Sequence, residues 1–446
     1  MLLVHARWVL PITAAPIEHG VVAVQGERIA YVGPREGAPA GEALELGDAV
    51  LLPGLVNVHT HLELTAMRGF LEELAFQPWI RTLTLARRAV LDTRERLLDS
   101  ARLGIAEGLR AGVTTYADTS DTGTSFEAML EAGVRGVVFH EVFGPDPAAC
   151  DGSLAELRAR AEVLRARETP LVRAGVSAHA PYSVSDALFT AVAAYARAEG
   201  FPLAVHVAES DDETRLVRDG EGAFAAALRE RGIGVRPERA RSPVALLEAT
   251  GVLAARPLLI HCVKVDEPDV AAIAAHDCAV AHCPASNAKL GHGVAPLAEL
   301  LAAGVRVGLG SDSVASNNRM DLLDEARLAV LSQRARLRDP LLLPADRALE
   351  LATLGGARAL ALDDRVGSLE TGKDADLAAF PLGSHAAPTF APETSLLHAG
   401  GGAGASFVAV AGRVLVRGGR LLQADADLPG RVQATAAALA RWRAKS

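Results

Sequence analysis

Residues 51–63 read LLPGLVNVHTHLE, a largely apolar run that ends in His59 and His61. Residues i and i+2 of an extended segment face the same side, so both imidazoles can reach one metal ion at the end of a buried strand. Taken alone, the pair fits equally well as two solvated histidines on a loop. The rest of the chain decides between these interpretations.

Three further motifs stand in the same position: His206 ends FPLAVH, His261 follows ARPLLI, and Asp312 follows VRVGLGS. Apolar segments of this kind alternate with Ala/Leu/Arg-rich helical segments, which predicts parallel strands joined by right-handed crossovers. Eight such units predict an α/β protein with a (β/α)8 TIM-like barrel. The expected strands are 51–58, 113–118, 133–142, 171–180, 201–209, 257–265, 278–286 and 305–312.

The C-terminal ends of barrel strands carry the active site in this fold. Imidazoles from several strands and the Asp312 carboxylate would therefore converge on one rim, a donor set that suits a hydrolytic metal. Glu209 lies just past its strand and can move a proton, although an exposed start of the polar loop SDDE is the plain alternative. A lone strand histidine such as His206 or His261 is more often a hydrogen-bonded core residue, but the shared rim favours the site.

The two flanks of the barrel have a different texture. Short apolar stretches separated by Gly, Glu and Arg fill residues 1–50, and strand-like segments return at 365–424. Neither flank is long enough for a good β-domain alone, so we expect one β-sandwich built from both. The predicted domains are 1–52 plus 365–446, including a C-terminal helix, and the catalytic barrel at 53–364.

Composition excludes several classes of protein. The 446 residues are 50% hydrophobic and 22% charged, which is typical of a globular chain. A net charge of -9 and the absence of a Lys/Arg cluster argue against a nucleic-acid partner. There is neither a signal-peptide layout nor a run of about 18 apolar residues, so we expect no membrane span and a cytoplasmic location. The four cysteines show no CxxC spacing.

Other residues near this rim keep two interpretations each. His179 ends the fourth expected strand and either contacts substrate, which we favour, or is structural. His282 and Asn287 follow the seventh strand and either shape the pocket or support it. The loops at 62–90 and 141–155 are expected to set side-group specificity. Each arginine of the first loop either binds a substrate carboxylate or, as we favour, is solvated: Arg68, Arg81, Arg87 and Arg88.

With these residues in place, the chain closely resembles the amidohydrolase superfamily, in its cytosine/adenosine deaminase and chlorohydrolase branch. The resemblance rests on PGLVNVHTHLEL, GVTTYAD, SAHAPYS, VHVAES, IHCVKV, HCPASNAKLG, GLGSDSVASNN and GSLETGKDADL, in that order. Binuclear barrels of this type often carry a carboxylated lysine at a strand end, and 171–182 contains no lysine. One metal is therefore expected rather than two.

The resemblance implies a role for each matching residue. It implies one divalent metal, zinc with iron as the alternative, held by His59, His61, His206 and Asp312. Glu209 matches the proton-shuttling glutamate, and Asp312 also acts on the water proton. His261 matches the histidine that orients or deprotonates the water. His179 and Trp79 match positions that contact the substrate, and Glu209 also faces it.

The resemblance predicts hydrolytic deamination of a 6-aminopurine nucleoside derivative, with release of ammonia. The form HTHLEL looks most like the aminodeoxyfutalosine deaminases of menaquinone biosynthesis. The alternatives are deamination of 5′-methylthioadenosine or S-adenosylhomocysteine, guanine deamination and triazine dechlorination. A remote alternative is a non-catalytic binding protein. A homodimer is common among such proteins, and no residue pattern here tests for one.

Overall fold

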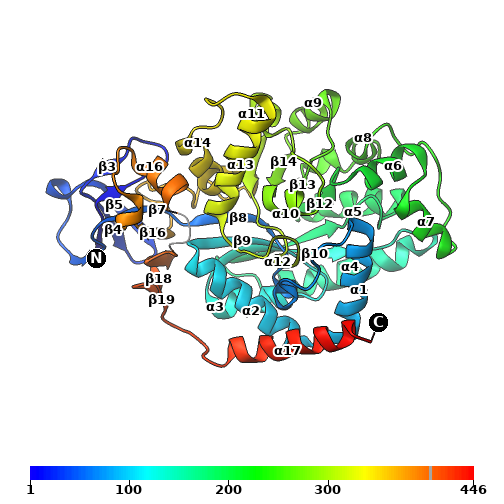
Figure 1. Ribbon diagram of the computed structural model, residues 1–446, viewed down its shortest axis with the longest axis horizontal. Coiled ribbons are helices and arrows are strands. Elements are labelled where there is room, and N and C mark those ends of the chain that lie inside the picture. The colour runs from blue at the N-terminus through cyan, green and yellow to red at the C-terminus, as the bar shows by residue number, and fades with distance from the viewer. Residues whose placement is uncertain (401–403, 446) are drawn as a thin grey trace.

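A barrel of eight parallel strands, together with the helices around it, forms the larger part of the molecule (Figure 1). The computed structural model describes residues 1–400 and 404–445. Each strand pairs in parallel with its neighbour in sequence, so the expected (β/α)8 barrel is confirmed. The strands are β8 (Leu55–Thr60), β9 (Val113–Ser120), β10 (Arg135–Val142), β11 (Val172–Ala178), β12 (Leu203–Val207), β13 (Leu258–His261), β14 (Ala279–His282) and β15 (Arg306–Leu309).

The first and last strands meet at their C-terminal ends. Thr60 and Asp312 form a parallel bridge, and the Asp312 amide donates a hydrogen bond to the His59 carbonyl at 2.9 Å. Gly308 permits this approach, because a Cβ there would lie 2.6 Å from Val58 Cγ1. Closure of the barrel therefore places the ends of β8 and β15 against each other.

Helices cover the outside of the barrel, and several of them begin at a side-chain N-cap. Ser185 caps α5 (Asp186–Glu199) by accepting a hydrogen bond from the Leu188 amide, and Gly200 ends that helix in the left-handed region. The other covering helices are α2 (Arg94–Arg110), α3 (Thr124–Ala132), α4 (Cys150–Arg165), α9 (Glu267–Ala275), α11 (Leu297–Ala302) and α13 (Leu322–Leu337).

Additional helices occupy the connections that leave the C-terminal ends of the strands. The longest of them is α1 (Phe76–Val90), which lies between β8 and α2. Two more, α6 (Asp211–Asp219) and α7 (Ala223–Glu230), follow β12. These connections build the walls around the strand ends, where the sequence places the site. Others are α8 (Pro243–Ala249), α10 (Pro284–Lys289) and α12 (Val314–Asn317).

The two flanks form the expected β-sandwich, at the left of Figure 1. β7 and β16, from opposite flanks, pair antiparallel, and one apolar cluster joins Val4 and Val22 of one sheet to Leu51 and Phe407 of the other. One sheet has the order β5 (Arg28–Pro34), β4 (Gly20–Gln25), β1 (Leu2–His5) and β6 (Glu42–Glu45). The other has the order β19 (Arg420–Leu421), β18 (Arg413–Arg417), β17 (Phe407–Val410), β16 (Leu377–Pro381), β7 (Ala49–Pro53), β2 (Trp8–Val9) and β3 (Ile17–Glu18).

A buried ion-pair cluster joins the sandwich to the start of a barrel strand. Arg135, the first residue of β10, is 1% exposed. Its guanidinium lies 2.8 Å from Asp374 Oδ2 and 2.9 Å from Asp376 Oδ2. All three side chains are out of water, so each depends on the others for its charge to be tolerated.

The helix α17 (Leu428–Arg443) runs away from the sandwich along the barrel (Figure 1). The sequence groups it with the sandwich by its place in the chain, whereas the structure packs it against α1 and α2. Its Leu428, Val432 and Leu439 belong to the same apolar cluster as Trp79. Within the described part of the chain, no helix has the length and apolar character needed to cross a membrane.

Candidate active site

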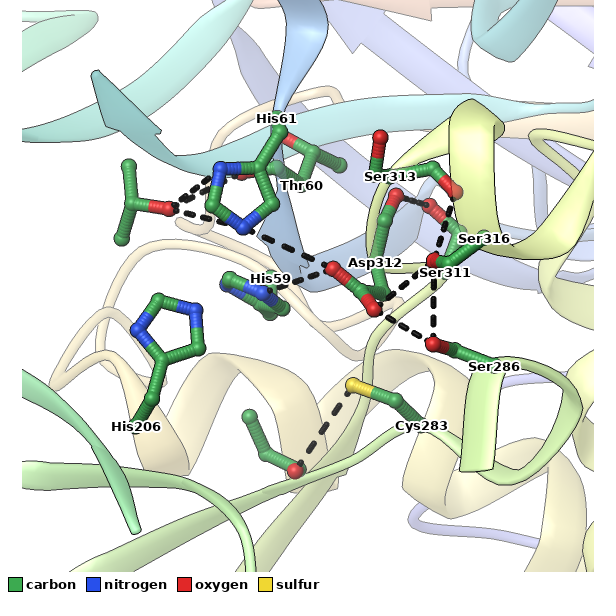
Figure 2. A network of polar contacts seen from close by, with 12 residues as sticks. His59, Thr60, His61, His206, Cys283, Ser286, Ser311, Asp312, Ser313 and Ser316 are labelled. Carbon is green, nitrogen blue, oxygen red and sulfur yellow. Dashed lines mark hydrogen bonds and ion pairs between the residues drawn. The ribbon is translucent and has the colours of Figure 1, made fainter. Parts of the chain in front are cut away.

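The predicted ligands converge at the C-terminal ends of the barrel strands (Figure 2). His59 Nε2 lies 3.1 Å and His61 Nε2 3.5 Å from the same oxygen, Asp312 Oδ1. The His206 ring centroid lies 4.9 Å from that of His59 and 5.4 Å from that of His61. A tetrahedral ion with bonds of about 2.0–2.1 Å sets its ligand atoms about 3.3 Å apart, so the contacts at Asp312 Oδ1 fit a divalent metal.

Contacts behind the cluster hold these side chains in place. Asp312 Oδ2 accepts hydrogen bonds from Ser286 Oγ at 2.5 Å and Ser316 Oγ at 2.9 Å, as Figure 2 shows. His206 Nδ1 lies 3.2 Å from the His179 carbonyl, which leaves Nε2 for a metal. Such outer contacts fix the orientation of metal ligands and strengthen their binding.

The electrostatics of the cluster also fit a cation. Burial, followed by the neighbouring His59, lowers the pKa of His61 to about 3. Burial and the neighbouring His179 hold the pKa of His206 well below its usual value. Burial alone would raise the pKa of Asp312, but His59, with His261 and His61, outweighs it and keeps that pKa well below its ordinary range. Neutral imidazoles beside a carboxylate are the forms that bind a divalent metal.

The backbone at these strand ends is unusual. Ala208, His261 and Asp312 have φ angles of 52°, 78° and 56°. Non-glycine residues in this region cost of order 1–3 kcal/mol each and persist only where the surroundings hold them. At Ala208 the holding group is the buried Glu213 carboxyl, which accepts hydrogen bonds from the Ala208 amide at 2.8 Å and the Glu209 amide at 2.9 Å. Burial raises the pKa of Glu213 to about 8.

Glu209 stands beside the cluster with two histidines around its carboxylate. Its Oε1 lies 3.5 Å from His261 Nε2 and 3.5 Å from His292 Nε2. Burial alone would raise the pKa of Glu209, but His261 and then His292 outweigh it and lower that pKa. No role is predicted for His292 from the sequence, because no periodic pattern marks it. The structure packs its ring against Phe76 at a centroid distance of 4.4 Å.

A cavity of about 790 Å³ opens from this cluster. It is within the range of about 300–1,000 Å³ typical of small-molecule sites. Trp79 and His179 line it, as do the four groups His61, His206, Glu209 and Asp312. Trp79 is buried and stacks near Phe76, with 6.3 Å between the ring centroids. The cavity walls therefore contain both residues expected to contact substrate, and that contact stays a prediction.

Other residues singled out in the sequence lie elsewhere or are already paired. His282 and Asn287 are buried, and neither lines the cavity. Arg68 is ion-paired with Glu107. Arg87 lines the cavity but is ion-paired with Asp121 and approaches Glu63.

Two buried acids at the cavity carried no prediction of their own. Glu141 lies 3.7 Å from His206 Nδ1, and burial raises its pKa well above normal. Glu63 accepts hydrogen bonds from the hydroxyls of Ser120 and Thr124 and from the Thr124 amide. It thereby ties the segment after β8 to the start of α3, a contact between distant segments that no spacing in the sequence indicates.

Comparison with known proteins agrees with this fold and site. The model of the amidohydrolase family matches residues 50–408, and the chain belongs to that family. It is 34% identical to a 5-methylthioadenosine/S-adenosylhomocysteine deaminase of Moorella thermoacetica, over 94% of this chain and 95% of the relative. An adenosine deaminase from Xanthomonas campestris with bound zinc superposes with a TM-score of 0.87 and 31% identity, covering 99% of this chain and 98% of that one.

The expected class of enzyme, a metal-dependent hydrolytic deaminase, is thereby confirmed. The more specific expectation, that the substrate is aminodeoxyfutalosine, receives less support. An aminofutalosine deaminase of Helicobacter pylori is 24% identical with a TM-score of 0.80, over 93% of this chain and all of that one, and this likeness shows the fold alone. The comparisons favour the alternative, the 5-methylthioadenosine/S-adenosylhomocysteine deaminases, over the aminodeoxyfutalosine reading.

Proposed function

We propose that the chain is a zinc-dependent deaminase of adenosine nucleosides that carry a 5′ substituent, with 5′-methylthioadenosine and S-adenosylhomocysteine as the first candidates. The observation that carries the proposal is the juxtaposition of Glu209 and His261, 3.5 Å apart, with the histidine and Asp312 cluster at the floor of a nucleoside-sized cavity. The activities named for curated relatives at 32–34% identity support the choice of substrate.

Four side chains are proposed to hold the metal: His59, His61, His206 and Asp312. When bound, zinc supplies a Lewis acid and lowers the pKa of water toward about 7. Zinc is favoured over iron because the adenosine deaminase from Xanthomonas campestris carries it. His261 has an unpartnered Nδ1, and its Nε2 faces Glu209, so it is proposed to act on the water rather than to complete the ligand set.

Glu209 is proposed to carry the proton that deamination needs. It takes a proton from the attacking water and delivers it to the ring nitrogen beside the amino-bearing carbon. His261 and Asp312 orient that water. A C–O bond then forms at the carbon as the C=N electron pair moves to the ring nitrogen. Glu209 or Asp312 then takes the proton of the newly added hydroxyl and passes it to the amino group. The C–N bond breaks as the C=O bond forms, and ammonia leaves.

The aromatic wall is proposed to hold the purine in the orientation that this chemistry needs. Trp79 and His179 line the same cavity as Glu209, and the flat side chains suit stacking on a heteroaromatic ring. The His179 Nδ1 is 2.6 Å from Ser183 Oγ, so Nε2 is the nitrogen free to face a substrate.

Ammonia release from a substrate panel tests the proposal. The zinc-loaded protein is given 5′-methylthioadenosine, S-adenosylhomocysteine, adenosine, aminodeoxyfutalosine and guanine, and chloride release is followed with a chlorinated triazine. We expect turnover with the 5′-substituted adenosines and a large loss in Glu209→Gln at unchanged zinc content. Turnover of guanine or the triazine alone would refute the adenosine proposal. Undiminished turnover by Glu209→Gln would exclude Glu209 as the proton shuttle.

A further inference from the structure

The outer part of the cavity is walled by two facing helical segments. One face of α1 lines it, with Gln77, Arg81, Thr84 and Arg88 at helical spacing. The other wall is α7, which contributes Phe224, Ala227 and Leu228, followed by Arg231 at its C-terminal end. Both helices lie in connections that leave the C-terminal ends of the strands, so they border the route by which a substrate enters.

The exposed charges on these walls are mainly positive. They are Arg81, Arg88 and Arg231 against Glu230, three positive groups and one negative, in a chain whose net charge is -9. Among the described residues, none of these three guanidinium groups has a hydrogen-bond or ion-pair partner. Arg87 differs, because its guanidinium is already ion-paired with Asp121 and Glu63.

The opposite end of the cavity carries the acids Glu209, Glu141 and Asp312 together with the histidines. The cavity is therefore polarised, with proton-transfer and metal-binding groups at its floor and unpaired arginines at its mouth. If the proposed function holds, the amino-bearing carbon of the purine must reach the floor. The 5′ substituent is the part of the nucleoside farthest from that carbon, so it faces the mouth.

We propose that Arg81 and Arg88, with Arg231 on the facing wall, bind a carboxylate on the 5′ substituent of the nucleoside. A guanidinium binds a carboxylate through paired hydrogen bonds, which an uncharged thioether cannot accept with comparable strength. Arg81 and Arg88 are two turns apart on α1, about 10 Å along the helix, so the mouth can hold carboxylates on chains of different length. The inference, which rests on the proposed function, ranks carboxylate-bearing substrates above 5′-methylthioadenosine.

A matched pair of substrates isolates the charge. We suggest 5′-S-(3-carboxypropyl)-5′-thioadenosine and its carboxamide, which differ little in size and shape. The zinc-loaded parent should favour the carboxylate in kcat/KM by about tenfold, the factor that one charge-assisted hydrogen bond can supply. The preference should shrink as salt rises from about 0.01 M to 1 M, because the screening length falls from about 30 Å to 3 Å.

Two variants decide the assignment. Arg81→Gln/Arg88→Gln should bring the ratio of the two kcat/KM values close to one. Arg197→Gln removes an exposed arginine of α5 that has no ion-pair partner among the described residues and does not line the cavity, and it should keep the parent ratio. A parent ratio near one, or a double variant that keeps the parent ratio, would overturn the proposal.

Failure of the proposed function gives a different signature. If neither nucleoside releases ammonia, the function fails, and the affinities of the same two compounds measured by calorimetry judge the subsite separately. Tighter binding of the carboxylate that disappears in the double variant would support the subsite. Equal affinities for the two compounds would overturn it.

Discussion

Glu213→Gln is expected to displace Glu209 without removing a metal ligand. The Glu213 carboxyl accepts hydrogen bonds from the amides of Ala208 and Glu209, at 2.8 and 2.9 Å, on the buried turn after β12. An amide side chain keeps one accepting oxygen and turns its NH₂ group toward the other backbone N–H. One buried donor is then left unpaired, at a cost of about 1–3 kcal/mol.

The turn can avoid this cost only by moving, since Ala208 is already in the left-handed region with φ 52°. A displacement of about 1 Å in a catalytic group can reduce turnover by about a hundredfold. We therefore expect kcat for ammonia release to fall by about that factor. We also expect the free energy of unfolding in urea to fall by about 1–3 kcal/mol, with the zinc content unchanged.

Asp212→Asn is the matched control, because it removes a carboxylate from the same turn of α6 and leaves both hydrogen bonds in place. It should leave kcat and the urea midpoint near those of the parent protein. If Glu213→Gln behaves in the same way as this control, the reasoning about the turn is wrong. If Glu213→Gln instead loses zinc, the carboxyl supports His206 rather than Glu209.

Three further outcomes follow from the charges. Asp312→Asn should lower the zinc content measured by atomic emission after dialysis, because an amide is a poor zinc ligand, whereas the exposed Asp363→Asn should keep full zinc. Asp376→Asn should lower the free energy of unfolding in urea by about 1–3 kcal/mol, because the buried Arg135 loses one of its two charged partners and keeps only Asp374, and an unchanged midpoint would contradict this. Burial raises the pKa of Glu325 to about 8 from 4.5, so the folded state holds a proton that the unfolded state releases, and stability should fall as pH rises from 4.5 to about 8. Glu325→Gln should flatten this slope in urea unfolding; an equally steep slope would exclude Glu325 as its source.

The barrel and the metal cluster could be predicted from sequence because both follow from local patterns. Strands covered on both faces read as continuous apolar runs, and the first polar residue after each run marks the strand's C-terminal end. Once eight strands are counted, barrel topology brings His59 and Asp312 together although most of the chain separates them.

The residues that support Glu209, namely His292 and Glu213, could not be predicted from the sequence, because their partners are set by tertiary packing. His292 belongs to a connection after α10 and reaches Glu209 only because Phe76 of α1 packs against its ring. Glu213 lies in SDDET, which reads as an exposed polar segment, yet the structure buries it under the turn after β12. Ser210, three residues before Glu213, has the spacing of a helix N-cap. That spacing indicates where α6 begins, but it does not indicate where the Glu213 carboxyl points.

The pairing of β7 with β16 has a consequence for how the chain folds. Val50 pairs with Phe380, so almost the whole barrel lies between two neighbouring strands of one sheet. Contacts of such long sequence separation form late and slow the folding of a domain. Until then β7, with all five of its residues destined for burial, has an unpaired edge. We therefore expect the sandwich to form after the barrel during refolding. The aggregation-prone intermediate should be the one in which β7 is not yet paired with β16.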